Sequence, residues 1–368
     1  MSNPDPCLPP VSGPLAALPA TGAPERIDLG SLSTRCQTVG PEHAARLARE
    51  LWGLSGDITR LDTEKDDTFA LRQQDRRLIF KIANPAEPPA ELDLQIQTLA
   101  HLNRHAPDLP VPQIVPALNG AALVALPLAD GVRHARMMTY LEGDLLDTLP
   151  PLGPEQYRIG EMNAKLRLAM SDFRHPFAAR QLAWDIRHLP RLAELLDHVP
   201  DQSQRSALTR AFRQILSLRD DIEALPRQIL HNDFSRSNLL VDRRKAQPIT
   251  GIIDFGDVVE TAVAIDLSTA MLNQLPRDAA EQGQDGMFAG PTRLFEGHIA
   301  HAPLSKAERR LLPHLVFARV VTRALLTLWR AGQFPENRAY ILRNTAQGWA
   351  QLDWYLSQNP AALSARLL

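Results

Sequence analysis

Apolar positions change their spacing near residue 140 of this 368-residue chain. Before that point, short apolar runs between charged turns predict β-strands. Leucines three or four positions apart predict a helix at 41–52 and another after Pro88-Pro89. The expected strands are 57–61, 68–72 and 77–83, followed by two or three more that lead to the segment 136–143. This part of the chain should therefore form a mostly antiparallel sheet with one inserted helix.

Helical spacing dominates after residue 140. Long amphipathic or capped runs predict helices at 154–173, 177–198 and 204–225, and again from about 261, 305 and 335. Short apolar strands interrupt them at 227–231, 238–241 and 249–253. The expected fold class is α+β with two lobes. A small sheet-rich lobe at 39–139 and a larger, mainly helical lobe at 140–368 are joined by a connector near 139–143.

Composition limits the partners and the cellular location that we expect for this chain. Seven of the first 24 residues are proline, so we expect residues 1–38 to form a flexible extension. A net charge of −2 offers no basic excess for nucleic acid, and the most apolar run, 121–129, is too short to cross a membrane. The two cysteines, Cys7 and Cys36, are too few for a disulfide framework. Because no apolar leader precedes Arg26, we predict a cytoplasmic protein with neither nucleic acid nor membrane as a partner.

Three oxygen-bearing side chains stand at a suggestive spacing in the larger lobe. Asp233 and Asn238 lie in "HNDFSRSNLLV", and Asp254 ends the apolar strand of "GIIDFGD". An antiparallel hairpin between these two segments would bring Asn238 opposite Asp254. A carboxylate and an amide oxygen make a hard site that suits Mg²⁺ and phosphate oxygens, while Asp233 could accept a proton from a hydroxyl. A loop Asp and Asn followed by Asp-Phe-Gly is the arrangement that transfers phosphoryl groups in kinases.

The small lobe offers a cation for the same chemistry. Lys81 lies in the apolar strand "LIFKIA", in a chain with only five lysines, and could hold the phosphates of a nucleotide. An acid on the next helix should orient it, and Glu91, Asp93 and Gln95 all remain candidates for that role. The turn that would cover the phosphates, at 62–69, contains no glycine.

These segments resemble the aminoglycoside phosphotransferase and choline kinase-like family, which shares the protein-kinase fold. The motifs that carry the resemblance are "FKI", "MTYLEG", "HNDFSRSNLLV" and "GIIDFGD", and within the family the likeness is to hydroxylysine kinase and related small-molecule kinases. The family usually has glycine where this chain has Asn232. A side chain there narrows the freedom of the loop backbone.

The resemblance implies a role for each of these residues. Asp233 would be the catalytic base, Asn238 and Asp254 would hold Mg²⁺, and Lys81 would contact the phosphates of ATP or GTP. Backbone groups of Thr139, Tyr140 and Leu141 would bind the nucleotide base, Asp266 would buttress the catalytic loop, and His231 would support it.

The acceptor is expected to be small. Protein kinases carry a lysine two residues after the catalytic Asp and an activation segment that ends in Ala-Pro-Glu, whereas this chain has Ser235 and no such segment. If the acceptor is an amine, Asp257 and Glu260 are candidates to face it, although both also suit the start of a helix.

The prediction is a Mg²⁺-dependent and nucleoside-triphosphate-dependent kinase that phosphorylates a hydroxyl of a small amine or amino acid such as hydroxylysine. Two alternatives remain open. The first is the same chemistry on an aminoglycoside, choline, homoserine or a sugar amine. The second is a catalytically silent protein of the same fold that binds a nucleotide or a partner. The oligomeric state is not predicted.

Overall fold

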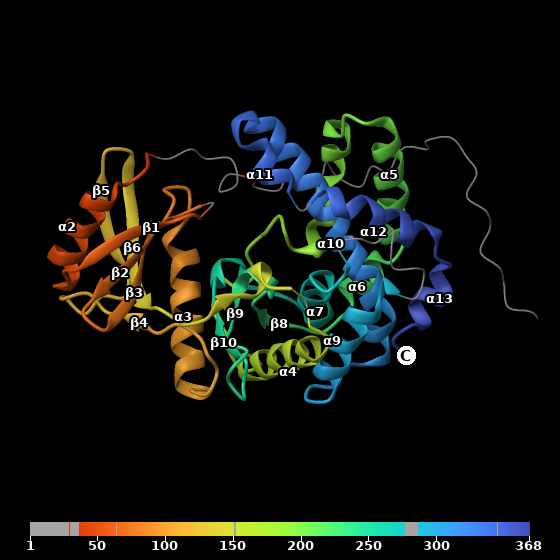
Figure 1. Cartoon of the computed structure of the whole chain (residues 1–368). Coiled ribbons are helices and arrows are strands. Elements are labelled where there is room, and N and C mark those ends of the chain that lie inside the picture. Colours follow the sequence, from red (N-terminus) through yellow and green to blue (C-terminus); the bar gives the residue numbers. More distant parts are fainter. Residues whose placement is uncertain (1–28, 30–36, 64, 151, 277–285, 344) are drawn as a thin grey trace, which may run out of the picture.

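The computed structural model describes residues 29, 37–63, 65–150, 152–276, 286–343 and 345–368. They form a small lobe and a larger lobe, with α3 on the side of the small lobe that faces the larger one (Figure 1). Most of the expected proline-rich extension, including Cys7 and Cys36, lies outside the described residues. The exceptions are Leu29, Gln37 and Thr38.

A six-stranded antiparallel sheet forms the small lobe, with the order β1-β2-β3-β6-β4 and with β5 paired to β6. The lobe begins with helix α2, and helix α3 is inserted between β3 and β4 as expected. Its elements are α2 (Pro41–Trp52), β1 (Asp57–Leu61), β2 (Asp67–Gln73), β3 (Arg76–Ile82), α3 (Pro89–His105), β4 (Ile114–Val115), β5 (Val124–Leu128) and β6 (Gly131–Thr139).

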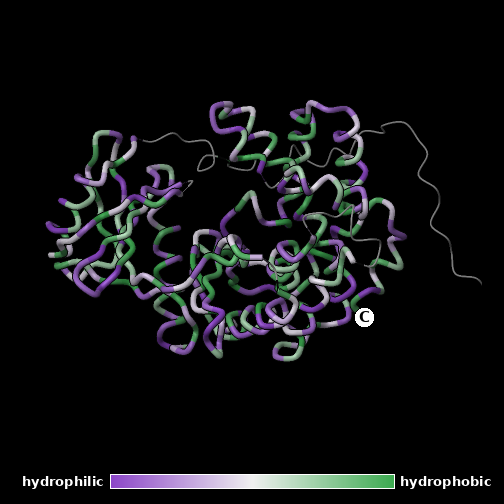
Figure 2. The backbone as a smooth tube through the Cα atoms, in the orientation of Figure 1, coloured by the Kyte–Doolittle hydropathy of each residue, from purple (hydrophilic) through white to green (hydrophobic). Residues whose placement is uncertain are grey.

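Each lobe has a hydrophobic core of its own. Trp52 of α2 packs edge-on against Phe80 at 5.4 Å between ring centroids, over the buried inner face of the sheet. The core of the larger lobe surrounds α7 and α10 and also takes in buried leucines of α3. Figure 2 shows hydrophobic residues concentrated in the interior of both lobes. Because α3 contributes to the core of the larger lobe, it joins the two lobes.

Helices make up most of the larger lobe. They are η1 (Leu146–Thr148), α4 (Gly153–Ala169), η2 (Ile186–His198), α5 (Gln202–Leu216), α6 (Arg219–Glu223), η3 (Arg236–Asn238), η4 (Phe255–Asp257), α7 (Val263–Leu272), α9 (Ala289–Ile299), α10 (Lys306–Gln333), η5 (Pro335–Asn337), α11 (Arg338–Leu342), α12 (Ala346–Ser357) and α13 (Pro360–Ala365). Among the described residues, α10 alone is long and apolar enough to cross a membrane. However, its most apolar window is 94% buried, as in the core helix of a globular lobe.

Two small antiparallel sheets carry the loops of interest. One pairs β7 (Asp144–Leu145), β9 (Leu239–Val241) and β10 (Ile249–Ile252), and the other pairs β8 (Arg227–Leu230) with β11 (Val259–Ala262). The predicted hairpin between β9 and β10 is present, with Ile252 opposite Leu239, so that Asn238 lies beside Ile253, one residue before Asp254. Gly143 fits against this hairpin with φ 146°, where a Cβ would lie 2.4 Å from Thr250 Oγ1, so the position requires glycine.

The structure differs from the sequence-based expectation at two places. The segment expected as a helix at 177–198 is regular only over η2, which is a 3-10 helix with Pro190 inside it, because proline lacks the N–H that an α-helix needs there. The helix expected from about residue 261 begins at Val263, and the four residues before it form strand β11 instead. Pairing with β8 decides that strand, and local sequence does not show it.

Candidate active site

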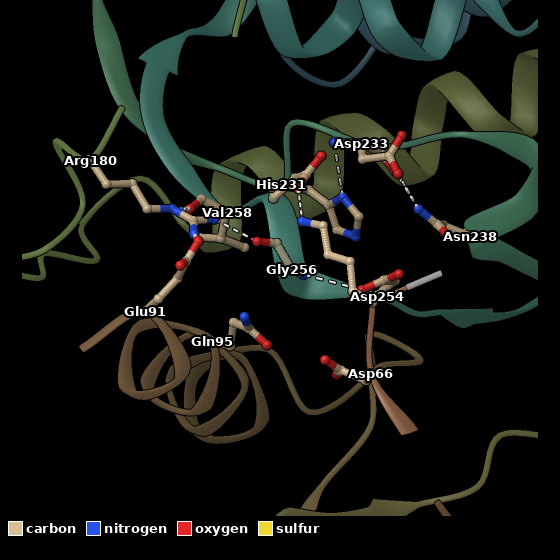
Figure 3. A network of polar contacts seen from close by, with 12 residues as sticks. Asp66, Glu91, Gln95, Arg180, His231, Asp233, Asn238, Asp254, Gly256 and Val258 are labelled. Atoms are coloured by element: carbon tan, nitrogen blue, oxygen red, sulfur yellow. Dashed lines mark hydrogen bonds and ion pairs between the residues drawn. The ribbon is translucent and has the colours of Figure 1, made fainter. Parts of the chain in front are cut away.

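The loop between β8 and β9 brings Asp233 and Asn238 into direct contact. Asn238 Nδ2 donates to Asp233 Oδ2 at 2.6 Å and to the Asp233 carbonyl at 3.0 Å. The backbone N–H of Ile253 donates to the Asn238 carbonyl at 2.9 Å, which places Asp254 beside the loop (Figure 3). The hairpin therefore gathers the three predicted oxygen donors at one place.

Asp254 adopts an unusual backbone conformation immediately after β10. Its φ of 59° and ψ of 75° lie in the left-handed region, which costs a residue with a side chain about 1–2 kcal/mol. Its Oδ1 accepts from the Gly256 N–H at 3.3 Å and lies 3.9 Å from Lys81 Nζ. The side chain is 54% exposed, so its carboxylate remains open to a ligand.

Burial and neighbouring charges shift the pKa values of Asp233 and Asp254 in opposite directions. Burial, followed by the negative charges of Asp257 and Asp254, raises the pKa of Asp233 well above its usual range. The Lys81 ammonium lowers the pKa of Asp254. Paired carboxyls whose pKa values differ in this way suit a proton acceptor beside a permanently ionised ligand.

His231 links the two segments of the site. Its Nδ1 accepts from the Asp233 N–H at 3.3 Å, so its Nε2 carries the proton and donates to the Ile253 carbonyl at 3.1 Å. Burial lowers the pKa of this histidine, which favours the neutral ring. The ring holds the loop against the strand.

Asn232 occupies the position where the resembling family has glycine. Its φ is 60°, a conformation that asparagine tolerates better than most residues with a side chain. Its N–H donates to Asp266 Oδ1 at 2.6 Å, as expected for a buttress, and its side-chain oxygen accepts from Arg319 Nη2 at 2.5 Å. Asp266 accepts in turn from Asn163 of α4 at 3.0 Å. The loop is thus tied to α4, α7 and α10.

The acid that lies beside Lys81 is none of the three candidates on α3, which were Glu91, Asp93 and Gln95. Lys81 Nζ lies 3.7 Å from Asp66 Oδ2, just before β2, and Arg136 donates to the same oxygen at 3.1 Å. Glu91 pairs with Arg180, Asp93 with His175, and Gln95 accepts from Arg136. Sequence reasoning missed Asp66 because it lies in the turn at 62–69, far from Lys81 along the chain.

The turn at 62–69 also reaches the other lobe. Lys65 Nζ lies 3.9 Å from Asp257 Oδ1, although its neighbour Glu64 is outside the described residues. The negative charge of Asp257 also acts on Asp233, so Asp257 lies close to the reaction centre. Glu260 instead lines a surface pocket with residues that include His175 and Arg227. Asp257 is therefore the better placed of the two candidates for an acceptor amine.

The donor chemistry of the site suits Mg²⁺ bound together with phosphates. Among the described residues no group of three or more His, Cys, Asp or Glu side chains could hold a metal by itself. Mg²⁺ needs fewer protein ligands when it bridges phosphate oxygens, and one carboxylate with one amide oxygen is a suitable set. Asp254 and Asn238 fit that requirement.

A profile described as "Phosphotransferase enzyme family" matches residues 57–304 of the chain, well over half of its length. The chain belongs to this family. It is a phosphotransferase, and the relatives that it matches include proteins named as kinases.

Three known proteins illustrate the relationship. Hydroxylysine kinase of Mus musculus is 23% identical over 247 residues, which cover 64% of this chain and 64% of that protein, less than two thirds of either. The solved microcompartment-associated aminopropanol kinase shares 23% identity with a TM-score of 0.67, covering 88% of this chain and 99% of that one. The amicoumacin kinase hAmiN, solved with AMP-PNP, Ca²⁺ and Ami, shares 14% identity with a TM-score of 0.62, covering 83% and 93%. The structural likenesses confirm the expected α+β, two-lobed, protein-kinase-like fold.

Two backbone N–H groups of the connector are already hydrogen-bonded within this phosphotransferase. The N–H of Thr139 donates to the Gln113 carbonyl at 2.9 Å, and the N–H of Tyr140 donates to the Arg77 carbonyl at 3.2 Å. A nucleotide base at the connector would therefore use the carbonyl groups of this segment and the N–H of Leu141. The sequence could not show this, because both partners come from other strands and loops.

Proposed function

We propose that this phosphotransferase moves the γ-phosphoryl group of a nucleoside triphosphate, with Mg²⁺, to a hydroxyl of a small amine or amino acid resembling hydroxylysine. The observation that carries the proposal is the meeting of Asp233, Asn238, Asp254 and Lys81 at one place between the lobes. Phosphoryl transfer needs a base, a metal-binding pair and a phosphate-binding cation in that arrangement.

Each residue has a distinct part in the proposed reaction. Asp233 accepts the proton of the attacking hydroxyl and aims its oxygen, and its raised pKa makes it a stronger base. Lys81 binds the phosphates next to Asp254. Mg²⁺, when bound by Asn238 and Asp254, would neutralise charge on the phosphoryl oxygens. His231 and Asp266 hold the loop, so that Asp233 needs no rearrangement before it acts.

A small amine alcohol is the acceptor class with the most support. Two of the proteins that this chain resembles are named kinases of hydroxylysine and of aminopropanol. Both of these compounds combine an amino group with a hydroxyl. Asp257, whose side chain is 18% exposed near the reaction centre, offers a carboxylate for the amine. The connector at 139–141 would hold either adenine or guanine, and a cytoplasmic location would supply the triphosphate and Mg²⁺.

The direct test is nucleotide consumption by the purified protein in the presence of Mg²⁺. ATP and GTP are each offered with 5-hydroxylysine and then with homoserine, choline, aminopropanol and an aminoglycoside, and Asp233→Asn serves as the control. We expect acceptor-dependent turnover with at least one amine alcohol, which the variant abolishes. Turnover only with an aminoglycoside or with choline would replace the acceptor, while nucleotide binding without turnover on any acceptor would favour the catalytically silent alternative.

A further inference from the structure

Arg180 holds the backbone that follows Asp254. It lies between α4 and η2, and its side chain is 5% exposed. Its Nε donates to the Val258 carbonyl at 3.0 Å, and its Nη2 donates to the Gly256 carbonyl at 2.5 Å. Gly256 is the same residue whose N–H donates to the Asp254 carboxylate. The guanidinium therefore braces the segment that sets the orientation of Asp254.

The same guanidinium reaches the other lobe. Its Nη1 forms an ion pair with Glu91 in the first turn of α3, the helix inserted in the small-lobe sheet (Figure 3). Both charges are largely buried, with Glu91 16% exposed, so Glu91 contributes to compensating the Arg180 charge together with Asp257 and Glu87. Removing one member of such a pair leaves a buried charge uncompensated and is strongly destabilising locally.

This ion pair differs from the one that the corresponding helix acid usually forms in kinases. There, the helix acid pairs with the strand lysine. Here Asp66 takes the place beside Lys81, and the helix acid Glu91 is directed to the segment that follows Asp254. The ion pair of Glu91 thus couples α3 directly to the segment that follows Asp254, whereas α3 reaches Lys81 through Gln95, Arg136 and Asp66.

A second contact between the same two segments provides an internal comparison. Asp93 Oδ2, two residues after Glu91, lies 3.1 Å from His175 Nε2, but no contact of this pair reaches residues 254–258 among the described residues. The two contacts join α3 to the segment 174–180, and of these two only the Glu91–Arg180 pair touches the segment that follows Asp254.

We propose that Glu91 and Arg180 form an interlobe latch, in which Arg180 is a positioning residue for Asp254 and docking of α3 sets the affinity for Mg²⁺ with the nucleotide. This inference rests on the proposed function. When the latch is intact, Asp254 is held ready for the metal. When Arg180 is removed, the segment 254–258 loses two donors, and when Glu91 is removed, the guanidinium loses the partner that holds it against this segment. In either case the Asp254 carboxylate no longer has a fixed direction.

The test is a Mg²⁺ titration of a fluorescent ATP analogue bound to the full chain, which requires no acceptor. We expect Arg180→Met and Glu91→Gln each to raise the Mg²⁺ concentration for half-maximal binding about tenfold, with no further loss in the double variant, because both break one latch. Arg180→Lys should recover part of the effect and gives the readout if Arg180→Met does not fold. Asp93→Asn is the matched control and should stay within twofold of wild type.

The outcomes separate this inference from the proposed function. An Arg180→Met protein with the Mg²⁺ dependence of wild type would overturn the latch, as would an equal loss in Asp93→Asn. Failure of the wild-type chain to bind the analogue would contradict the proposed function itself, and the latch with it.

Discussion

At the scale of single residues, each reacting group is set by neighbours that lie far away in sequence. Asp233 is made a stronger base by burial and by the nearby carboxylates of Asp257 and Asp254. Asp254 is kept ionised by Lys81, and Lys81 itself is held beside Asp66. Residues of one chemical type therefore have different tasks because their surroundings differ.

Replacing each carboxylate should give a different kinetic signature. Asp233→Ala should lower kcat about 10²–10⁴-fold with little change in nucleotide affinity, since it removes a base that acts during the transfer. Asp254→Ala should instead raise the KM for the Mg²⁺-nucleotide. Steady-state kinetics with varied nucleotide at saturating acceptor measure both, and unchanged kinetics in both variants would contradict the assigned site.

Asp66 offers a second test at this scale. Asp66→Asn keeps the volume but removes the charge that faces both Lys81 and the buried Arg136. We expect about a tenfold loss in kcat/KM for the nucleotide and a fall of about 2 kcal/mol in the free energy of unfolding. Kinetics and urea denaturation measure the two effects. Asp62→Asn, at an exposed position of the same turn, should change neither quantity.

At the scale of elements, close packing of α4 against α9 supports the catalytic loop. A Cβ on Gly160 would lie 1.9 Å from the Leu294 carbonyl, so the two helices approach closely only because no side chain intervenes. Their contact lets His298 donate to Asn163 at 2.9 Å, and Asn163 donates to the Asp266 that holds the loop. The contact between α4 and α9 thus supports the loop that carries Asp233 through the side chains of His298, Asn163 and Asp266.

Gly160→Ala should separate these helices. We expect a loss of about 1–3 kcal/mol in the free energy of unfolding, because overpacking forces the backbones apart, together with a reduced kcat. Chemical denaturation and kinetics provide the readouts. Gly332→Ala is the control, since a Cβ there meets nothing within 4 Å and alanine favours helix, so that variant should be as stable as wild type or slightly more so.

At the scale of the whole molecule, buried neutral groups make the stability depend on pH. Burial lowers the pKa of His298 to about 3. Its Nε2 has no hydrogen-bond partner among the described residues, so a proton there would be an uncompensated buried charge. Because the folded pKa lies below the ordinary value of about 6.5, the contribution of this group is complete above that pH and is lost progressively as the pH falls.

Acid should therefore weaken the fold through His298. This group alone can remove on the order of 3 kcal/mol from the free energy of unfolding between pH 7 and pH 4, as an upper limit. His298→Asn places an amide N–H where Nδ1 donates to Asn163 and should flatten the loss. His301→Gln, at an exposed position near the same helix end, should not. Denaturation curves of the three proteins across this pH range decide the matter, and parallel curves would contradict the assignment.

The sequence by itself determined the local hairpin that brings Asp233, Asn238 and Asp254 together, and it predicted these residues as the candidate site. Asn238 meets the strand that ends in Asp254 because only one short turn separates β9 from β10, and the alternating sheet and helix patterns likewise predicted the two lobes. Local spacing and turn chemistry are sufficient for such short-range pairing.

Only the tertiary structure decided which charges meet. Three residues of α3, two acids and one amide, were equally plausible partners of Lys81, yet the docking of α3 directs Glu91 to Arg180, and Lys81 lies beside Asp66. Strand β11 depended in the same way on its pairing with β8. The physical reason is that an ion pair depends on the distance between side chains and not on separation along the chain. Pairing of β2 with β3 sets that distance for Lys81 and Asp66, and packing of the two lobes sets it for Glu91 and Arg180.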